Sequence, residues 1–188
     1  MTRPVLLLLN GAPGSGKSTL VTLLAQRRPL ALALDVDQLK HGLGCWADDL
    51  QASGVQARRL ALAAARQHLA DGHDVLIGQY LARPAFLEQL EDLAAECGAR
   101  FVEAALVLEA DGLAGRLAAR RRAPDRPEQA ANDRFVGPAD AAAHAAALEE
   151  LLTVRPHVHR LDAGRPREEL VGLLARILDA PETPQEHP

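Results

Sequence analysis

The sequence is poor in lysine, aromatic residues and cysteine. Only two of its 21 basic residues, Lys17 and Lys40, are lysines, and it has one tryptophan, one tyrosine and three phenylalanines. Its two cysteines, Cys45 and Cys97, stand far apart and form no C-x-x-C pair. This usage favours a reduced, cytoplasmic protein over a disulfide framework or a zinc site.

Basic charge and long apolar runs are also lacking. The net charge is −4, opposite in sign to that expected of a protein with a broad nucleic-acid-binding face. No apolar run approaches the roughly 20 residues of a membrane-spanning helix. The run at residues 5–9 is too short for the core of a signal peptide. We therefore expect no membrane contact and no nucleic-acid partner.

What the chain does contain is an alternation of short apolar runs with longer helical patterns. The 188 residues, 48% of them apolar, are enough for one domain with a sizeable core, predicted over residues 1–180. Strands are predicted at residues 5–9, 30–34, 75–77, 101–108 and 157–161, and helices at 16–27, 55–70, 84–96, 113–122, 139–152 and 167–178. This order predicts an α/β fold with a five-stranded parallel sheet.

Three stretches do not follow the alternation. Residues 181–188 hold three prolines and no apolar periodicity, which predicts a disordered tail. Residues 41–54 and 120–138 are predicted to be irregular, and the second is rich in arginine and proline. Long irregular stretches in compact domains are more often functional than accidental. We expect both to lie near the carboxyl ends of the strands, where α/β sheets bind ligands.

The strongest motif follows the first predicted strand and opens the first predicted helix. It matches G-x-x-x-x-G-K-[ST] and consists of Gly11, Ala12, Pro13, Gly14, Ser15, Gly16, Lys17 and Ser18, with Thr19 directly after it. Glycines let the backbone N–H groups point at phosphate oxygens, and the helix start adds its positive dipole end. Lys17 supplies a mobile charge for the terminal phosphates, and the Ser18 hydroxyl is placed to bind Mg²⁺. The motif predicts a phosphate loop rather than a chance glycine-rich turn.

Two further segments narrow the class. The N-K-x-D motif of GTP-binding switch proteins is absent. The run Asp37-Gln38-Leu39-Lys40, followed by Gly44, resembles the D-x-L-[RK] segment of small P-loop kinases related to chloramphenicol phosphotransferase, zeta-toxin and polynucleotide 5′-kinase. Leu108-Glu109-Ala110, leading into Gly115-Arg116-Leu117-Ala118-Ala119-Arg120, resembles their fourth strand and the start of their arginine-bearing lid.

The resemblance implies a three-layer P-loop fold, a short arginine-rich lid at about residues 120–138, and ATP- and Mg²⁺-dependent phosphoryl transfer to a hydroxyl group of a small molecule. Position matching implies that Asp37 accepts the hydroxyl proton and that Arg120 and Arg126 are lid arginines. Arginines spread the charge that develops on the transferred group. Arg116 would share a helix face with Arg120.

Further residues are candidates for contacts with the substrate. Asp35 would face the same way as Asp37 if the second strand continued that far, and it is a candidate substrate or metal contact. The alternative is that either aspartate caps a helix. Lys40 and Arg83 are candidate substrate contacts. The alternative for Arg83 is that it lies on the surface and contacts no substrate.

Gln79 marks a departure from the family. It stands where many relatives carry an aspartate that holds the magnesium water shell. It can hydrogen-bond to a metal-bound water or to the substrate, but it supplies no charge. This departure keeps a second class open, a non-catalytic or slowly hydrolysing ATP-binding regulator. Trp46 and Tyr80 are rare aromatics that either stack on the substrate or fill the core.

Overall fold

The computed structural model describes residues 3–123 and 135–181. In chain order its elements are β1 (Val5–Gly11), α1 (Lys17–Ala25), β2 (Leu32–Leu34), α2 (Val36–His41), α3 (Leu50–Ala70), β3 (Val75–Gly78), α4 (Ala85–Glu96), β4 (Arg100–Val107), α5 (Ala110–Arg122), the 3₁₀ helix η1 (Pro138–Asp140), α7 (Ala141–Thr153), β5 (His159–Asp162) and α8 (Arg167–Asp179).

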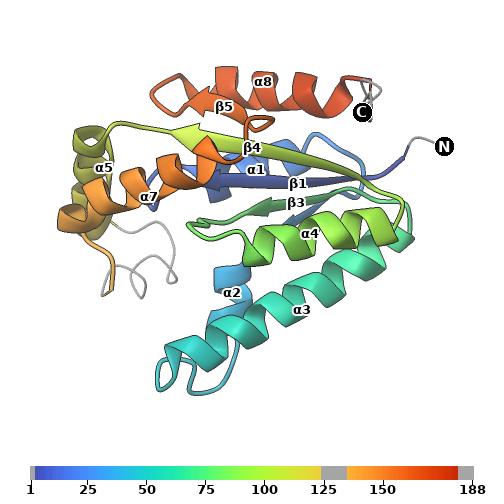
Figure 1. The fold of residues 1–188 in the computed structure, drawn as a ribbon, viewed down its shortest axis with the longest axis horizontal. Coiled ribbons are helices and arrows are strands. Elements are labelled where there is room, and N and C mark those ends of the chain that lie inside the picture. The colour runs from blue at the N-terminus through green and yellow to red at the C-terminus, as the bar shows by residue number, and fades with distance from the viewer. Residues whose placement is uncertain (1–2, 124–134, 182–188) are drawn as a thin grey trace.

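The five strands form one parallel sheet in the order β2-β3-β1-β4-β5 (Figure 1). The register aligns Leu8 of β1 with Ile77 of β3 on one side and with Glu103 of β4 on the other. The predicted five-stranded parallel sheet is confirmed. Because all strands run the same way, the carboxyl ends of β1, β2 and β3 meet at one edge.

Helices cover both faces of the sheet, as expected of a three-layer sandwich (Figure 1). All seven residues of β1 are buried, and its side chains alternate between two cores. Leu6 and Leu8 pack with residues of α3 and α4 on one face. Leu7 and Leu9 pack with residues of α1 and α8 on the other. A strand buried on both faces explains the continuous apolar run that predicted it.

Residues 41–54 are more helical than expected. α2 begins directly after β2, and α3 begins at Leu50, five residues before the predicted start. The Asp49 side chain caps α3 by accepting hydrogen bonds from the backbone N–H groups of Gln51 (3.0 Å) and Ala52 (2.9 Å). Once this cap starts the helix, the cost of Gly54 inside it, about 1 kcal/mol, does not interrupt it.

The predicted lid divides between described and undescribed residues. α5 stays helical through Arg122 and packs on α7 through Leu113, Leu117 and Ala141. The remainder of the predicted lid up to residue 134, with Arg126, lies outside the described residues, as does most of the predicted tail.

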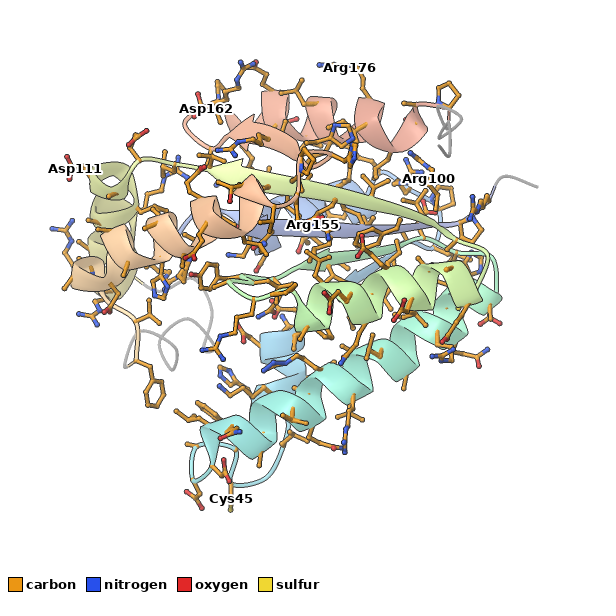
Figure 2. The ribbon with its side chains drawn as sticks, viewed as in Figure 1. Cys45, Arg100, Asp111, Arg155, Asp162 and Arg176 are labelled. Atoms are coloured by element: carbon orange, nitrogen blue, oxygen red, sulfur yellow. The ribbon has the colours of Figure 1, made fainter. Side chains whose placement is uncertain are left out.

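Glu103, a buried carboxylate of the sandwich, is paired with an arginine through one of its oxygens. Arg155 (Figure 2) follows α7 and donates from Nε to Glu103 in β4 at 2.6 Å, and it also pairs with Glu91 of α4. Burial raises the pKa of Glu103, and the bond to Arg155 opposes this rise. Both cysteines are free thiols, and Cys45 is exposed between α2 and α3 (Figure 2). Within residues 3–123 and 135–181, no helix is long and apolar enough to cross a membrane.

Candidate active site

A cavity of about 960 Å³ lies at the carboxyl edge of the sheet. Its walls come from the loop after β1, the residues after β2 and β3, the α5 helix and the start of α8. The lining residues include Pro13, Gly14, Ser15, Gly16, Lys17, Ser18, Asp35, Asp37, Lys40, Gln79, Tyr80, Arg116, Arg120, Arg165 and Arg167. Ligands bind to parallel α/β sheets at this edge.

The glycine-rich loop has the backbone that its sequence requires. Gly14 and Gly16 adopt φ values of 88° and 101°, in the left-handed region that favours glycine. Gly16 also precedes the first turn of α1, so the loop ends at the positive end of that helix. The buried Ser15 hydroxyl has no hydrogen-bond partner among the described residues. An unpaired polar atom beside a helix N-terminus fits a site that receives phosphate oxygens.

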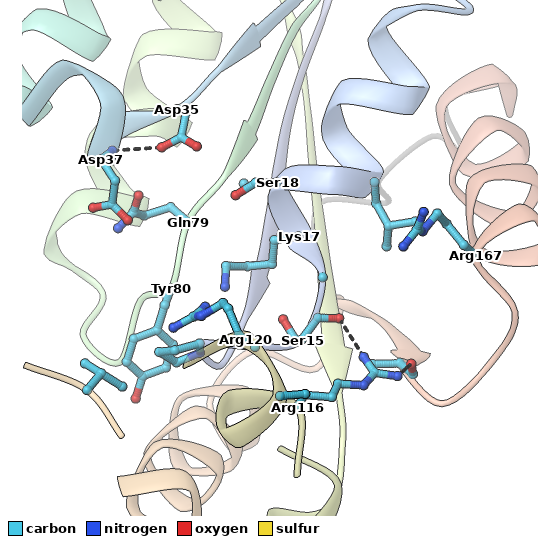
Figure 3. Close-up of a pocket in the computed structure, with 18 of the residues that line it drawn as sticks. Ser15, Lys17, Ser18, Asp35, Asp37, Gln79, Tyr80, Arg116, Arg120 and Arg167 are labelled. Carbon is cyan, nitrogen blue, oxygen red and sulfur yellow. Dashed lines mark hydrogen bonds between the residues drawn. The ribbon is translucent and has the colours of Figure 1, made fainter. Parts of the chain in front are cut away.

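Lys17 is the cation at the centre of the cavity (Figure 3). Its Nζ donates a 3.1 Å hydrogen bond to the carbonyl oxygen of Ala12. Burial lowers its pKa to about 8, against the opposing effect of Asp37, while the charge of Arg120 lowers it further. Asp37 and Arg120 therefore both lie near enough to Lys17 to affect the charge of its ammonium group.

The two aspartates after β2 do not share a strand face, because β2 ends at Leu34. The predicted strand also ends at residue 34, and the condition under which Asp35 and Asp37 would face the same way, a strand that continues through them, is not met. Asp35 is instead the N-cap of α2 and accepts hydrogen bonds from the backbone N–H groups of Asp37 (2.9 Å) and Gln38 (3.3 Å). Asp37 lies in the first turn of α2 and lines the cavity beside Gln79 (Figure 3). The helix cap explains why the strand stops here.

The two α5 arginines that line the cavity differ in their partners. Arg116 donates to the carbonyl oxygens of Ser15 (3.2 Å) and Ala163 (2.7 Å), and so joins the glycine-rich loop to the loop after β5. Arg120 lies one turn further along α5 and points toward Lys17 (Figure 3). Arg116 therefore joins two loops of the site, and Arg120 faces the part of the cavity that holds Lys17.

Of the other residues predicted to belong to the site, some line the cavity and some do not. Lys40 lines the cavity, with its Nζ 4.9 Å from the ring centroid of Trp46. Arg83 is exposed and outside the cavity lining, so the structure does not bring it into the site. Gly11 and Ala12 are buried behind the loop, and Thr19 lies in α1 away from the lining.

Sequence reasoning missed Asn10, which is fully buried at the end of β1. Its amide nitrogen donates to the Leu81 carbonyl oxygen (3.0 Å), and its carbonyl oxygen accepts from the N–H groups of Gly11 (2.8 Å) and Leu81 (2.9 Å). Asn10 thereby fixes the segment after β3, which carries Gln79, against the start of the glycine-rich loop. The only signal in the sequence is a polar residue that directly follows a run of leucines.

Groups that could hold a cation are few. Among the described residues, no cluster of three or more histidines, cysteines, aspartates or glutamates could bind a metal ion. Oxygen-bearing side chains of the lining include the Ser18 hydroxyl, the carboxylates of Asp35 and Asp37 and the Gln79 amide. Such a site suits a cation that arrives with phosphate oxygens of its own.

The fold and this site define a P-loop nucleotide-binding domain. Residues 6–136 match the AAA domain family AAA_33, and the chain belongs to that family. No protein of curated function matches the sequence.

Several solved structures share the fold. A presumed kinase from Chloroflexus aurantiacus has a TM-score of 0.68 at 20% identity, over 95% of this chain and 100% of its own. The tunicamycin resistance protein of Deinococcus radiodurans has a TM-score of 0.63 at 14% identity, over 97% and 99%. The Mycobacterium tuberculosis APS kinase, in complex with AMPPNP and APS, has a TM-score of 0.61 at 20% identity, over 96% and 100%. The expected kinase-like P-loop fold is confirmed.

Proposed function

We propose that this protein is a cytoplasmic kinase that transfers a phosphoryl group from ATP, with Mg²⁺, to a hydroxyl group of a small molecule. One observation carries the proposal: Lys17, Asp37 and Arg120 line a single cavity of about 960 Å³. A phosphate-binding cation, a carboxylate and an arginine in one cavity are the parts that phosphoryl transfer to an alcohol requires.

The nucleotide would lie along the glycine-rich loop. Its phosphates would meet the backbone N–H groups at the start of α1, the Ser15 hydroxyl and the Lys17 ammonium. The base would extend toward the end of the cavity lined by Arg116, Ala163 and Arg165. The two hydrogen bonds of Arg116 support this placement, because they hold the base end and the phosphate end of the cavity in a fixed relation.

The acceptor would enter from the opposite end, beside Asp37 and Gln79. Its hydroxyl oxygen forms a bond to the γ-phosphorus, the bond from that phosphorus to the ADP oxygen breaks, and the hydroxyl proton passes to an Asp37 carboxylate oxygen. Lys17 and Arg120 offset the negative charge that spreads over the transferred group. Mg²⁺ bound with the nucleotide would be held by phosphate oxygens, Ser18 and Asp35, and would supply further charge neutralisation.

The structural neighbours support phosphoryl transfer without naming the acceptor. They include an APS kinase bound to AMPPNP, and a gluconokinase from Sinorhizobium meliloti with a TM-score of 0.56 at 18% identity, over 95% of this chain and 94% of its own. Their acceptors differ from one another, so the alcohol used here has to be found by experiment.

One observation favours a second function, that of an ATP-binding regulator. Gln79 follows β3 beside Asp37, where a carboxylate would add charge for the metal (Figure 3). An amide hydrogen-bonds to water or substrate but holds a cation less strongly than a carboxylate does. A regulator would bind ATP and transfer nothing.

Incubation with γ-labelled ATP, Mg²⁺ and pooled hydroxylated acceptors separates the two functions. A kinase labels at least one pool, and Lys17→Met abolishes both labelling and nucleotide binding. Nucleotide binding by the wild type with no labelled acceptor in any pool would contradict the kinase and support the regulator.

A further inference from the structure

Three of the five aromatic side chains lie in the cavity wall or in contact with it. Of the five aromatic residues in the sequence, only Phe86 and Phe101 pack into the main hydrophobic cluster below the sheet. Tyr80 and Phe135 line the cavity, and Trp46 contacts Lys40, which also lines it. We propose that the acceptor carries an aromatic or similarly flat apolar group beside its reactive hydroxyl. This inference rests on the proposed function, since it assigns the Asp37 end to the acceptor.

Two large apolar side chains of the lining are open to solvent. Leu50 is 39% exposed and Phe135 is 53% exposed. Leu50 is the first residue of α3, which packs against α2, the helix that carries Asp37. Phe135 precedes Val136, whose carbonyl oxygen accepts a hydrogen bond from Arg121 of α5. When an apolar ligand covers exposed apolar surface in a cavity, that surface leaves water, and this makes binding more favourable.

Tyr80 also lines the cavity, and its contacts hold its ring in place. Its ring packs against a small apolar cluster that includes Leu148 and Leu152 of α7, and meets the His144 ring edge-on at 5.0 Å. Its hydroxyl donates to the His144 carbonyl oxygen at 3.3 Å. Burial raises the pKa of Tyr80, so the phenol stays neutral. Figure 3 shows Tyr80 on the same side of the cavity as Asp37 and Gln79.

Two carboxylates of the lining disfavour an acceptor that places an anionic group beside them. Asp35 and Asp37 both line it, and a carboxylate or phosphate on the acceptor would meet like charge there. The Lys40 ammonium lies over the Trp46 ring, which His41 also contacts at 4.3 Å between ring centroids. An uncharged alcohol with a flat apolar group avoids this repulsion, and its flat group can lie against the aromatic side chains of the lining.

Matched pairs of alcohols test the inference without knowledge of the natural acceptor. In each pair one member carries a phenyl group and the other a methyl group, as in phenyl and methyl β-glucoside. Binding is followed by ligand-observed NMR with a non-hydrolysable ATP analogue present, and by the fluorescence of Trp46, the only tryptophan. We expect the phenyl member of at least one pair to bind about tenfold more tightly than the methyl member, a difference of about 1.4 kcal/mol.

Substitutions in the cavity lining test which side chains cause the preference for the phenyl member. Leu50→Ala and Phe135→Ala should each reduce the phenyl preference severalfold and leave affinity for the ATP analogue unchanged. Leu60→Ala is the matched control, because Leu60 lies on the same helix, is 38% exposed and is not part of the lining.

The inference would be overturned if the two members of every pair bind equally, if neither binds, or if Leu50→Ala and Leu60→Ala behave alike. Labelling by γ-labelled ATP is scored separately. Phenyl-dependent binding without any transfer would count against the kinase but not against the apolar character of the site.

Discussion

At the scale of single residues, Lys17 serves the binding of a ligand at the expense of the stability of the ligand-free protein. Its pKa falls to about 8 because burial disfavours the charged ammonium more than Asp37 and Asp35 favour it. A charged group placed in such surroundings destabilises the ligand-free protein. The same charge is what a polyphosphate ligand would meet.

Replacing Lys17 should therefore separate stability from binding. The pKa of Lys17 is about 8 in the folded protein and 10.5 in the unfolded chain. Below pH 8 the charged ammonium lowers the free energy of unfolding. Between about pH 8 and 10.5 the folded protein releases this proton before the unfolded chain does, so the free energy of unfolding rises. Lys17→Met should raise the melting temperature of the ligand-free protein at pH 7, by roughly 2–4 °C for each kcal/mol relieved. This gain should shrink toward pH 10.5, and nucleotide binding should be lost at every pH.

Calorimetric melting across this pH range and titration with an ATP analogue measure both effects. A variant less stable than the wild type at pH 7, or one that still binds the analogue with unchanged affinity, would contradict the role given to Lys17.

The sequence identified these residues unevenly, for physical reasons. The phosphate loop is local, so eight consecutive residues specify its shape and its chemistry. That Lys17 and Asp37 line one cavity was accessible only through the resemblance, because the sequence alone does not place α2 beside the phosphate loop. Asn10 and the clamp made by Arg116 depend on contacts between segments more than 45 residues apart, as the separation of Arg116 from Ala163 shows. No periodicity records such contacts.

At the scale of elements, the close approach of β3 to α1 places Lys17. A Cβ atom at Gly78 would lie 3.3 Å from the Lys17 carbonyl carbon and from a methyl group of Val21. The end of β3 therefore meets the first turns of α1 directly. The sequence offered only an unremarkable glycine after an apolar run.

Two glycine substitutions test this packing. Gly78→Ala should destabilise the protein by about 1–3 kcal/mol, the usual cost of overpacking, and should weaken binding of an ATP analogue. Gly115→Ala is the matched control, because a Cβ there meets nothing within 4 Å and it lies inside α5. It should stabilise by about 0.5–1 kcal/mol through helix propensity.

Urea unfolding curves and calorimetric titration measure the two variants together. Equal stabilities for both, or unchanged nucleotide affinity in Gly78→Ala, would show that the β3–α1 contact does not position the loop.

The element boundaries show what patterns can and cannot predict. The five strands follow from apolar runs and the long helices from their periodicity, and both agree with the structure. The start of α3 at Leu50 and the whole of the short helix α2 were missed, because helix caps at Asp49 and Asp35 begin these two helices. A cap is recognised only when the helix after it is already known.

At the scale of the whole molecule, one cavity joins segments from across the chain. The loop after β1, helix α5 and the loop after β5 are already connected through Arg116. A nucleotide that contacts all three should stabilise the fold as a unit.

An ATP analogue at a concentration 100-fold above its Kd should add about 2.7 kcal/mol to the free energy of unfolding. For a chain of this size that corresponds to a rise of roughly 5–10 °C in melting temperature. Lys17→Met should show no rise. Differential scanning calorimetry tests this, and an equal rise in both proteins would place the nucleotide elsewhere.

The central claim, that Asp37 takes the proton of an acceptor hydroxyl in a cavity that also binds ATP, is tested most directly by Asp37→Asn. Binding of an ATP analogue and transfer of label to the acceptor are measured in the same preparation. Asp48→Asn, at an exposed aspartate that does not line the cavity, serves as the control. We predict that Asp37→Asn keeps the wild-type nucleotide affinity and loses about 10²-fold or more of the transfer rate, as expected for loss of a general base. Transfer at the wild-type rate in Asp37→Asn, or an equal loss in Asp48→Asn, would contradict the account.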